Sequence, residues 1–84
     1  MTTVLLTGEG QADFDRLPAA MQARVLGIFA RLEAWPLVSG AKPLRYDWKG
    51  HFRIRAGDWR VIFRLVAPDV LIVRIQHRRD VYED

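Results

Sequence analysis

Residues 51–77 read HFRIRAGDWRVIFRLVAPDVLIVRIQH and alternate between apolar and polar or basic side chains. Alternation with a period of two indicates β-strands that bury one face. Gly57-Asp58 is a two-residue signal for a tight hairpin turn, and Ala67-Pro68-Asp69 separates this hairpin from the next apolar run. The pattern therefore predicts an antiparallel meander of three strands. These strands are 51–56, 59–65 and 70–77.

The register of the last strand depends on how the chain turns before it. If Pro68-Asp69 alone formed the loop, Arg74 would face the core opposite Phe63, which is a costly place for a charge. A three-residue turn moves Arg74 to the other face, so burial favours the longer turn. The expected pairs are then Val66 with Val70, Leu65 with Leu71, Phe63 with Val73 and Val61 with Ile75.

This register gives the meander two unlike faces. One face is apolar and suits the packing of helices; it would carry Phe52, Ile54, Trp59, Val61, Phe63, Leu65, Leu71, Val73 and Ile75. The opposite face would carry Arg53, Arg55, Arg60, Arg64, Arg74 and Arg78.

The N-terminal half predicts one strand and two helices. Residues 1–7 are short, β-branched and apolar, and Thr7 is a candidate N-cap for a short helix through Phe14 and Asp15. A longer helix is expected from Pro18 to about Trp35, followed by a loop over 37–43. Its apolar stripe is Met21, Val25, Ile28, Phe29, Leu32 and Trp35. The predicted fold class is α+β, with a β-α-α-β-β-β order and two helices on one face of an antiparallel sheet.

Length and composition bound the remaining possibilities. A chain of 84 residues is expected to form one domain, 1–84, with no room for a separate cofactor domain. With no cysteine, neither a disulfide framework nor a thiolate metal site is expected. The longest aliphatic stretch is Val70 to Val73, and the start of the chain lacks the pattern of an export signal. A cytoplasmic protein that does not contact a membrane is therefore expected.

The net charge of +3 conceals an asymmetry. Residues 1–41 carry three basic and four acidic side chains. Residues 42–79 carry three acidic and ten basic side chains, and eight of these ten basic side chains are Arg. Arginine offers a planar fork of donors that fits phosphate, although a GC-rich genome also favours Arg codons. In the predicted hairpin Arg55 faces Arg60, and like charges across a strand pair are destabilising. An external anion, above all nucleic acid phosphate, is therefore the expected ligand of this face.

Three aromatic side chains near this face could stack on bases: Tyr46, Trp48 and Tyr82. Trp48 is better explained as a residue that packs against the core.

The stretch LRYDWKGHFRIRAGDWRVIFRL (44–65), followed by HRRDVY (77–82), resembles the RelE/ParE superfamily of bacterial type II toxins, in particular its RelE-like branch. The resemblance covers nearly the whole chain. It implies a ribosome-dependent mRNA endonuclease that is held inactive by a cognate antitoxin. The implied reaction is attack of a 2′-hydroxyl on the adjacent phosphate of mRNA in the ribosomal A site, which needs no metal and no cofactor.

The resemblance also implies roles for single residues. Arg60 corresponds to the arginine that stabilises the phosphate, Arg78 to the one that protonates the leaving oxygen, and Tyr82 to the tyrosine that orients the substrate. Arg53 and Arg55 stand where the family has two lysines, one of them the proposed general base. Arginine is already protonated at neutral pH and cannot readily accept a proton as a general base would, so both are assigned to electrostatic stabilisation.

The general base must then come from elsewhere. His51 and His77 are the side chains whose ordinary pKa lies near neutrality, although a strand-end His77 is also explained as a structural residue. Further contacts to substrate phosphate or RNA are expected from Lys49, His51, Arg64, Arg74 and Arg79.

Two other functions stay open at this stage. The same fold is that of ParE-like toxins, which poison DNA gyrase without nuclease activity, and a third possibility is a module that only binds an acidic antitoxin or operator DNA. The expected partners are the ribosome, mRNA and an antitoxin that wraps the helices and the sheet edge. Such an antitoxin could neutralise the toxin by covering the basic groove or by its bulk. Binding to operator DNA is expected only from the toxin–antitoxin complex.

Overall fold

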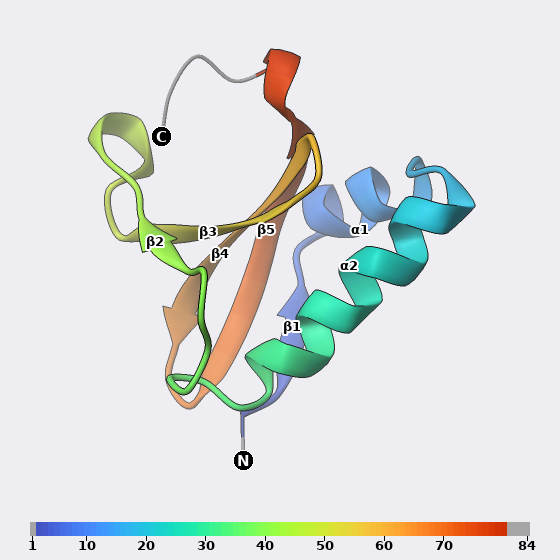
Figure 1. Ribbon diagram of the computed structural model, residues 1–84. Helices are drawn as coiled ribbons and strands as arrows, with labels where there is room; N and C mark the ends of the chain where they lie inside the picture. Colours follow the sequence, from blue (N-terminus) through green and yellow to red (C-terminus); the bar gives the residue numbers. More distant parts are fainter. Residues whose placement is uncertain (1, 81–84) are drawn as a thin grey trace.

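The computed structural model describes residues 2–80 and consists of two helices and one five-stranded sheet. The strand order is β1-β5-β4-β3-β2; β1 runs parallel to β5, and the other neighbours are antiparallel. Both helices lie on one side of the sheet (Figure 1). The elements are β1 (Val4–Leu6), α1 (Gly8–Asp15), α2 (Ala19–Leu32), β2 (Lys42–Pro43), β3 (His51–Ala56), β4 (Trp59–Val66) and β5 (Asp69–His77), with 3-10 turns at Tyr46–Trp48 and Arg78–Asp80.

This is the expected α+β architecture, with two differences. The sheet is mixed because β1 joins its edge in parallel, and β2 lies within the segment 37–43 that the sequence predicts as a loop. Among residues 2–80, no helix is long and apolar enough to cross a membrane.

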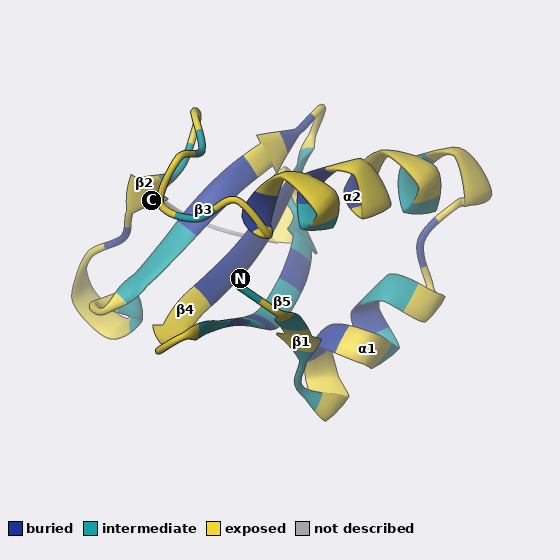
Figure 2. Cartoon of the chain, turned by 90° about the horizontal axis from the view of Figure 1, so that it is seen from below, coloured by how far each residue is buried: buried dark blue, intermediate teal, exposed yellow. Residues whose placement is uncertain are grey.

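The core lies between the helices and the sheet (Figure 2). Phe63 is fully buried at its centre, and Trp35 packs edge-on against both Phe63 and Phe52, with ring centroids 5.5 and 5.3 Å away. The helix stripe therefore packs on the apolar face of the strands, and the predicted members Ile54, Val61, Phe63 and Ile75 are buried. The buried members of the core are Leu17, Val25, Ile28, Leu32, Ile54, Ala56, Val61, Phe63, Val70, Ile72 and Ile75.

The register between β4 and β5 differs from the prediction. Val66 pairs with Asp69, so the turn is the two residues Ala67-Pro68, and Phe63 pairs with Ile72 rather than Val73. The corresponding sequence-based pairs near the turn are wrong: Leu65 lies opposite Val70 and is exposed, while Val70 and Ile72 are buried in place of Leu71 and Val73.

A β-bulge reconciles this turn with the burial argument. The register shifts between Ile62 and Phe63, where Val73 is the extra residue, and beyond it Val61 pairs with Ile75 as predicted. Arg74 therefore still faces away from the core, because the extra residue of the bulge, rather than a longer turn, shifts the alternation of buried and outward-facing side chains along β5.

α1 is fixed to β5 at its beginning. The Thr7 hydroxyl accepts a hydrogen bond from the Gly10 N–H, as expected of an N-cap, and donates one to the Val73 carbonyl at 3.2 Å. A Cβ atom at Gly10 would lie 2.6 Å from the carbonyl oxygen of Ile72. The helix thus approaches the backbone of β5 as closely as only glycine allows.

Candidate functional site

The side of the sheet that faces away from the helices carries most of the predicted site, and we call it the arginine face. Hydrogen-bonded pairing arranges it in three rows across β3, β4 and β5. The rows are His51, Arg64 and Leu71; then Arg53, Ile62 and Arg74; then Arg55, Arg60 and Gln76. The structure therefore brings Arg53, Arg55 and Arg60 together, with Arg55 directly opposite Arg60 as the hairpin predicts.

The arginine face is less open than the sequence suggests. Arg53 and Arg60 are only 6% and 4% exposed, whereas Arg55 and Arg64 are exposed. Ile62, in the middle row, is fully buried. The sequence correctly assigns Arg53 and Arg60 to this face, but both are buried there and little of either is open to an external anion. The aliphatic stems of arginines can cover an apolar neighbour such as Ile62, and this places part of each stem out of contact with water.

Arg74 is held by a carboxylate from α1. Its Nε donates a hydrogen bond of 2.7 Å to Asp13 Oδ2, the same oxygen that accepts the backbone N–H of Ile75 at 2.9 Å. The other oxygen, Oδ1, accepts a hydrogen bond of 2.8 Å from Arg16 Nη2. Asp13 is only 6% exposed, so one buried carboxylate joins α1 to the edge of β5 and to two guanidinium groups.

These contacts shift the pKa values of both partners. Burial by itself would raise the pKa of Asp13, but the hydrogen bonds from Arg74 and Ile75 and the charges of Arg74 and Arg16 outweigh it, so the pKa lies below its ordinary value. The hydrogen bond to Asp13 raises the pKa of Arg74 in spite of its burial. Both groups are therefore firmly charged at neutral pH.

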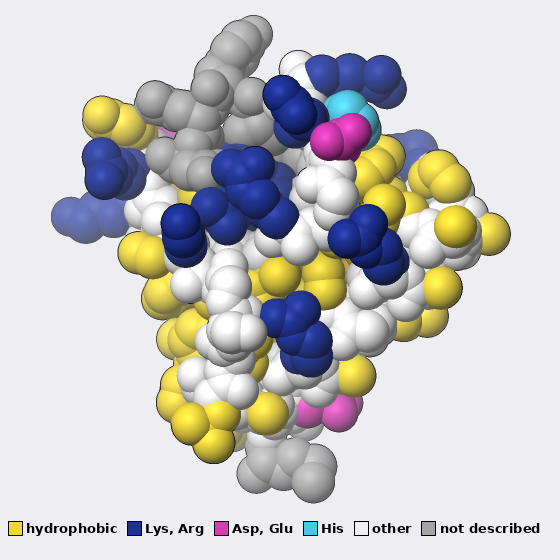
Figure 3. All heavy atoms as spheres, in the orientation of Figure 1, with side chains coloured by type: hydrophobic (Ala, Val, Ile, Leu, Met, Phe, Trp, Pro, Cys, Tyr) yellow, Lys and Arg dark blue, Asp and Glu magenta, His cyan; other side chains and the backbone are white. Residues whose placement is uncertain are grey.

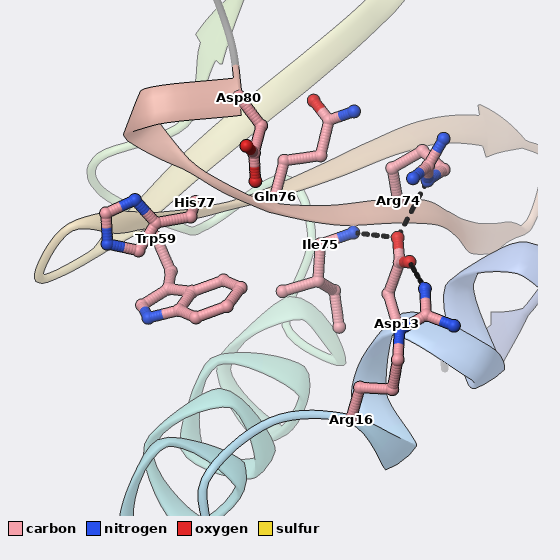
Figure 4. Close-up of a pocket in the computed structure, with 8 residues that line it drawn as sticks. All are labelled: Asp13, Arg16, Trp59, Arg74, Ile75, Gln76, His77 and Asp80. Carbon is pink, nitrogen blue, oxygen red and sulfur yellow. Dashed lines mark hydrogen bonds and ion pairs between the residues drawn. The ribbon is translucent and has the colours of Figure 1, made fainter.

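A hollow of about 250 Å³ lies beside this ion pair, at the end of β5 (Figure 4). Trp59 and His77 lie on one side of it, Asp13 and its two arginines lie on the other, and Ile75 is between them. Gln76 and Asp80 complete the lining.

The two histidines lie in different surroundings. His51 shares the arginine face through its pairing with Arg64, and its ring packs edge-on against Trp48 at 5.1 Å. His77 pairs with Trp59 and packs edge-on against it at 5.0 Å, and its Nδ1 accepts the backbone N–H of Arg79. Strand alternation therefore places His77 on the side of β5 opposite Gln76 and the arginine face.

The other candidates lie around the rim. Arg78 follows β5 and is exposed; its backbone N–H donates to the Asp58 carbonyl at 2.7 Å, and Nη1 lies 3.7 Å from Asp58 Oδ1. Lys49 and Arg79 are exposed as well. Tyr46 is 73% exposed, whereas Trp48 is partly buried. Tyr82 lies outside the described residues.

The basic side chains dominate one view of the surface. Lys and Arg (dark blue) spread over the upper and central part of Figure 3, with few acidic side chains among them. Within residues 2–80, no group of three or more His, Asp or Glu side chains is placed to hold a metal ion.

Asp13 is a residue of this region that is not among the candidates predicted from the sequence. The signal was present: Gly10, Asp13, Phe14 and Leu17 form a helical stripe with spacings of three and four, and a carboxylate within an apolar stripe needs a buried partner. The near-neutral charge of the N-terminal half gave no reason to look for one there.

Comparison with known proteins places the chain in a family. Residues 4–82 match the family of ParE toxins of type II toxin–antitoxin systems (parDE), so the chain belongs to the RelE/ParE superfamily of type II toxins. It is 36% identical over 83 residues to Toxin RelG of Mycobacterium tuberculosis, covering 95% of this chain and 94% of that protein.

Solved structures agree with this placement. The RelBE2 toxin–antitoxin complex of Mycobacterium tuberculosis contains a chain that is 34% identical, with a TM-score of 0.79, covering 92% of this chain and 98% of that one. A chain of the archaeal RelE–RelB complex of Pyrococcus horikoshii shares the fold at 23% identity, with a TM-score of 0.75, covering 95% of this chain and 98% of that one.

Proposed function

We propose that the protein is a ribosome-dependent mRNA endonuclease that inhibits translation by cutting mRNA in the ribosomal A site. The observation that carries this proposal is the grouping of Arg53, Arg55 and Arg60 on one hairpin, with Arg55 opposite Arg60. A phosphate attacked by a neighbouring hydroxyl gains negative charge in the transition state. Guanidinium groups that the fold already holds in place stabilise that charge without reorganisation.

The proposed step is an internal transfer at one phosphodiester. The 2′-oxygen attacks phosphorus as its proton passes to a base, the bond from phosphorus to the 5′-oxygen breaks, and that oxygen takes a proton from Arg78. A 2′,3′-cyclic phosphate remains. Arg60 stabilises the pentacoordinate phosphate together with Arg53 and Arg55, and Tyr82 orients the substrate.

Two histidines are candidates for the base. His51 lies on the arginine face, two rows from the Arg55–Arg60 pair. His77 follows Gln76, the β5 residue opposite Arg60, and its side chain lies on the other side of the sheet. Replacing each histidine by Gln in turn tests which of them is the base. Only loss of the base should remove the fall in cleavage rate on the acid side of the pH profile.

The proposed partners are the ribosome with its mRNA and a cognate antitoxin. The similar chain of RelBE2 is part of a toxin–antitoxin complex. This chain exposes apolar side chains that an antitoxin could cover, among them Leu26 on α2 at 54% and Leu37 after it at 87%. Binding to operator DNA is proposed only for the complex, and the cytoplasm is the proposed location.

The test uses translating ribosomes that carry a defined message. The unchanged protein should give discrete cuts, and Arg60→Ala should reduce their rate by more than about a hundredfold, as loss of one preorganised donor does elsewhere. Because Arg60 is buried, its variants are first checked for folding by circular dichroism. Arg31 lies on α2, on the opposite side of the sheet from the arginine face. The Arg31→Ala variant loses the same charge and should still cut.

A second candidate function is a toxin that poisons DNA gyrase without nuclease activity. The match of residues 4–82 to the ParE toxin family favours it. Intact messages on ribosomes, together with trapped gyrase–DNA cleavage complexes, would replace the endonuclease proposal with this one. Failure of both assays would favour a module that only binds an antitoxin or operator DNA.

A further inference from the structure

We propose that the hollow beside β5 binds one nucleotide of single-stranded RNA, with its phosphate on Arg74, and that Asp13 is the positioning residue of this site. The inference rests on the proposed function, since it takes RNA as the ligand, and it extends the site beyond the cleaved bond. Arg74 lies at the border between the hollow and the arginine face, in the same row as Arg53.

Asp13 fixes the direction in which Arg74 can donate. Within residues 2–80, the Arg74 side chain donates to Asp13 through Nε (Figure 4), and its terminal amino groups make no hydrogen bond to that carboxylate. The side chain is 33% exposed, so these amino groups can still reach a ligand. A guanidinium that is held by Nε loses less entropy when its other donors bind phosphate.

The rest of the hollow suits a nucleoside better than a bare anion. Its charged lining is balanced, with Arg16 and Arg74 against Asp13 and Asp80. Ile75 and Trp59 provide apolar surface, and Gln76 and Asp80 provide donors and acceptors for a base edge or a ribose hydroxyl. A phosphate held at the border by Arg74 would thus place its nucleoside against this lining.

The experiment measures the affinity of the full protein, freed of antitoxin, for a short fluorescent single-stranded oligoribonucleotide. Removing an acidic side chain from a protein that binds polyanions should strengthen binding through the long-range field. A positioning role for Asp13 predicts the opposite, namely weaker RNA binding. Arg74→Gln should weaken RNA binding about tenfold because it loses the charge-assisted contact to phosphate. Asp13→Asn should weaken it by a similar factor because it weakens the hydrogen bond that holds Arg74 in place.

The matched control is Asp15→Asn. Asp15 lies on the same helix, is exposed and is bonded to Gln11, so this change removes the same charge without touching Arg74. It should leave affinity unchanged or slightly higher. The double variant Asp13→Asn/Arg74→Gln should bind no more weakly than Arg74→Gln alone, because Asp13 acts through Arg74. Thermal unfolding of each variant separates weaker binding from loss of fold.

A second probe tests the nucleoside part of the site. One abasic residue is moved along the oligonucleotide, and one position should cost the unchanged protein at least about fivefold in affinity. Gln76→Ala should reduce the dependence on the base at that same position. Uniform tolerance of the abasic residue would overturn this part of the inference.

The outcomes separate this inference from the proposed function. If the unchanged protein does not bind the oligonucleotide, or if Asp13→Asn behaves like Asp15→Asn, the inference is wrong whatever the cleavage assay gives. If Asp13→Asn weakens antitoxin binding but not RNA binding, the hollow belongs to the protein partner and the inference is also overturned. Uncut messages together with Asp13-dependent RNA binding would overturn the endonuclease alone.

Discussion

Asp13 shows how one side chain connects the fold to the site. Its carboxylate accepts the Ile75 N–H at the edge of β5, where β1 has already ended, and it also holds Arg74 and Arg16. Without it, the N–H of Ile75 and the guanidinium of Arg74 would each need another acceptor. An acidic residue in a basic protein thus stabilises both the sheet edge and the orientation of an arginine.

This arrangement predicts a pH-dependent stability. The pKa of Asp13 in the folded protein lies below its ordinary value of 3.8, so its stabilising contribution is present above that pH and is lost as the pH falls through the folded-state pKa. Asp13→Asn should therefore lower the free energy of unfolding by about 1–3 kcal/mol at neutral pH, since it weakens charged hydrogen bonds. The difference should shrink in acid, as measured by urea unfolding across pH. A deficit that stays constant down to the most acid pH would contradict this explanation.

Among the elements, α1 depends on its close approach to β5. Gly10→Ala would bring a Cβ atom to 2.6 Å from the Ile72 carbonyl oxygen, which is backbone and cannot turn aside. We expect a loss of about 1–3 kcal/mol in the free energy of unfolding, the usual range for overpacking. Gly8→Ala is the control, because nothing lies within 4 Å of the added atom. Equal stabilities in denaturant titrations would show that α1 can shift freely on the sheet.

The elements also show what the sequence could and could not predict. The β3–β4 register was predictable because Gly57-Asp58 and the alternation agree, and both are local signals. The β4–β5 register was not, because a longer turn and a bulge both keep Arg74 out of the core, and alternation alone does not distinguish them. Parallel pairing of β1 with β5 joins residues far apart in the chain, where local patterns carry no signal.

The same limit applies to the candidate site. Strand alternation was enough to place Arg53, Arg55 and Arg60 on one face, but it did not predict that Arg53 and Arg60 would be buried. The contact between Asp13 and Arg74 spans 61 positions of sequence. A contact of that kind follows from tertiary packing, and only the buried carboxylate in the stripe of α1 pointed to it.

At the scale of the whole molecule, the two sides of the sheet differ in both structure and charge. The helices carry the near-neutral half of the sequence on one side of the sheet, and the basic half forms the opposite side (Figures 1 and 3). For the proposed function we expect the protein to approach a polyanion with the sheet side first, because the field of the basic side chains would orient the encounter. The ribosome with its message is such a polyanion.

In the proposed reaction, a 2′-hydroxyl of the message attacks its own adjacent phosphate. It is tested most directly by comparing two messages on translating ribosomes, identical except for a single 2′-deoxynucleotide on the 5′ side of the bond that is cut. We expect the all-ribose message to be cut there and to end in a 2′,3′-cyclic phosphate, while the deoxy-substituted message stays intact at that bond. Equal cutting of both messages would contradict it.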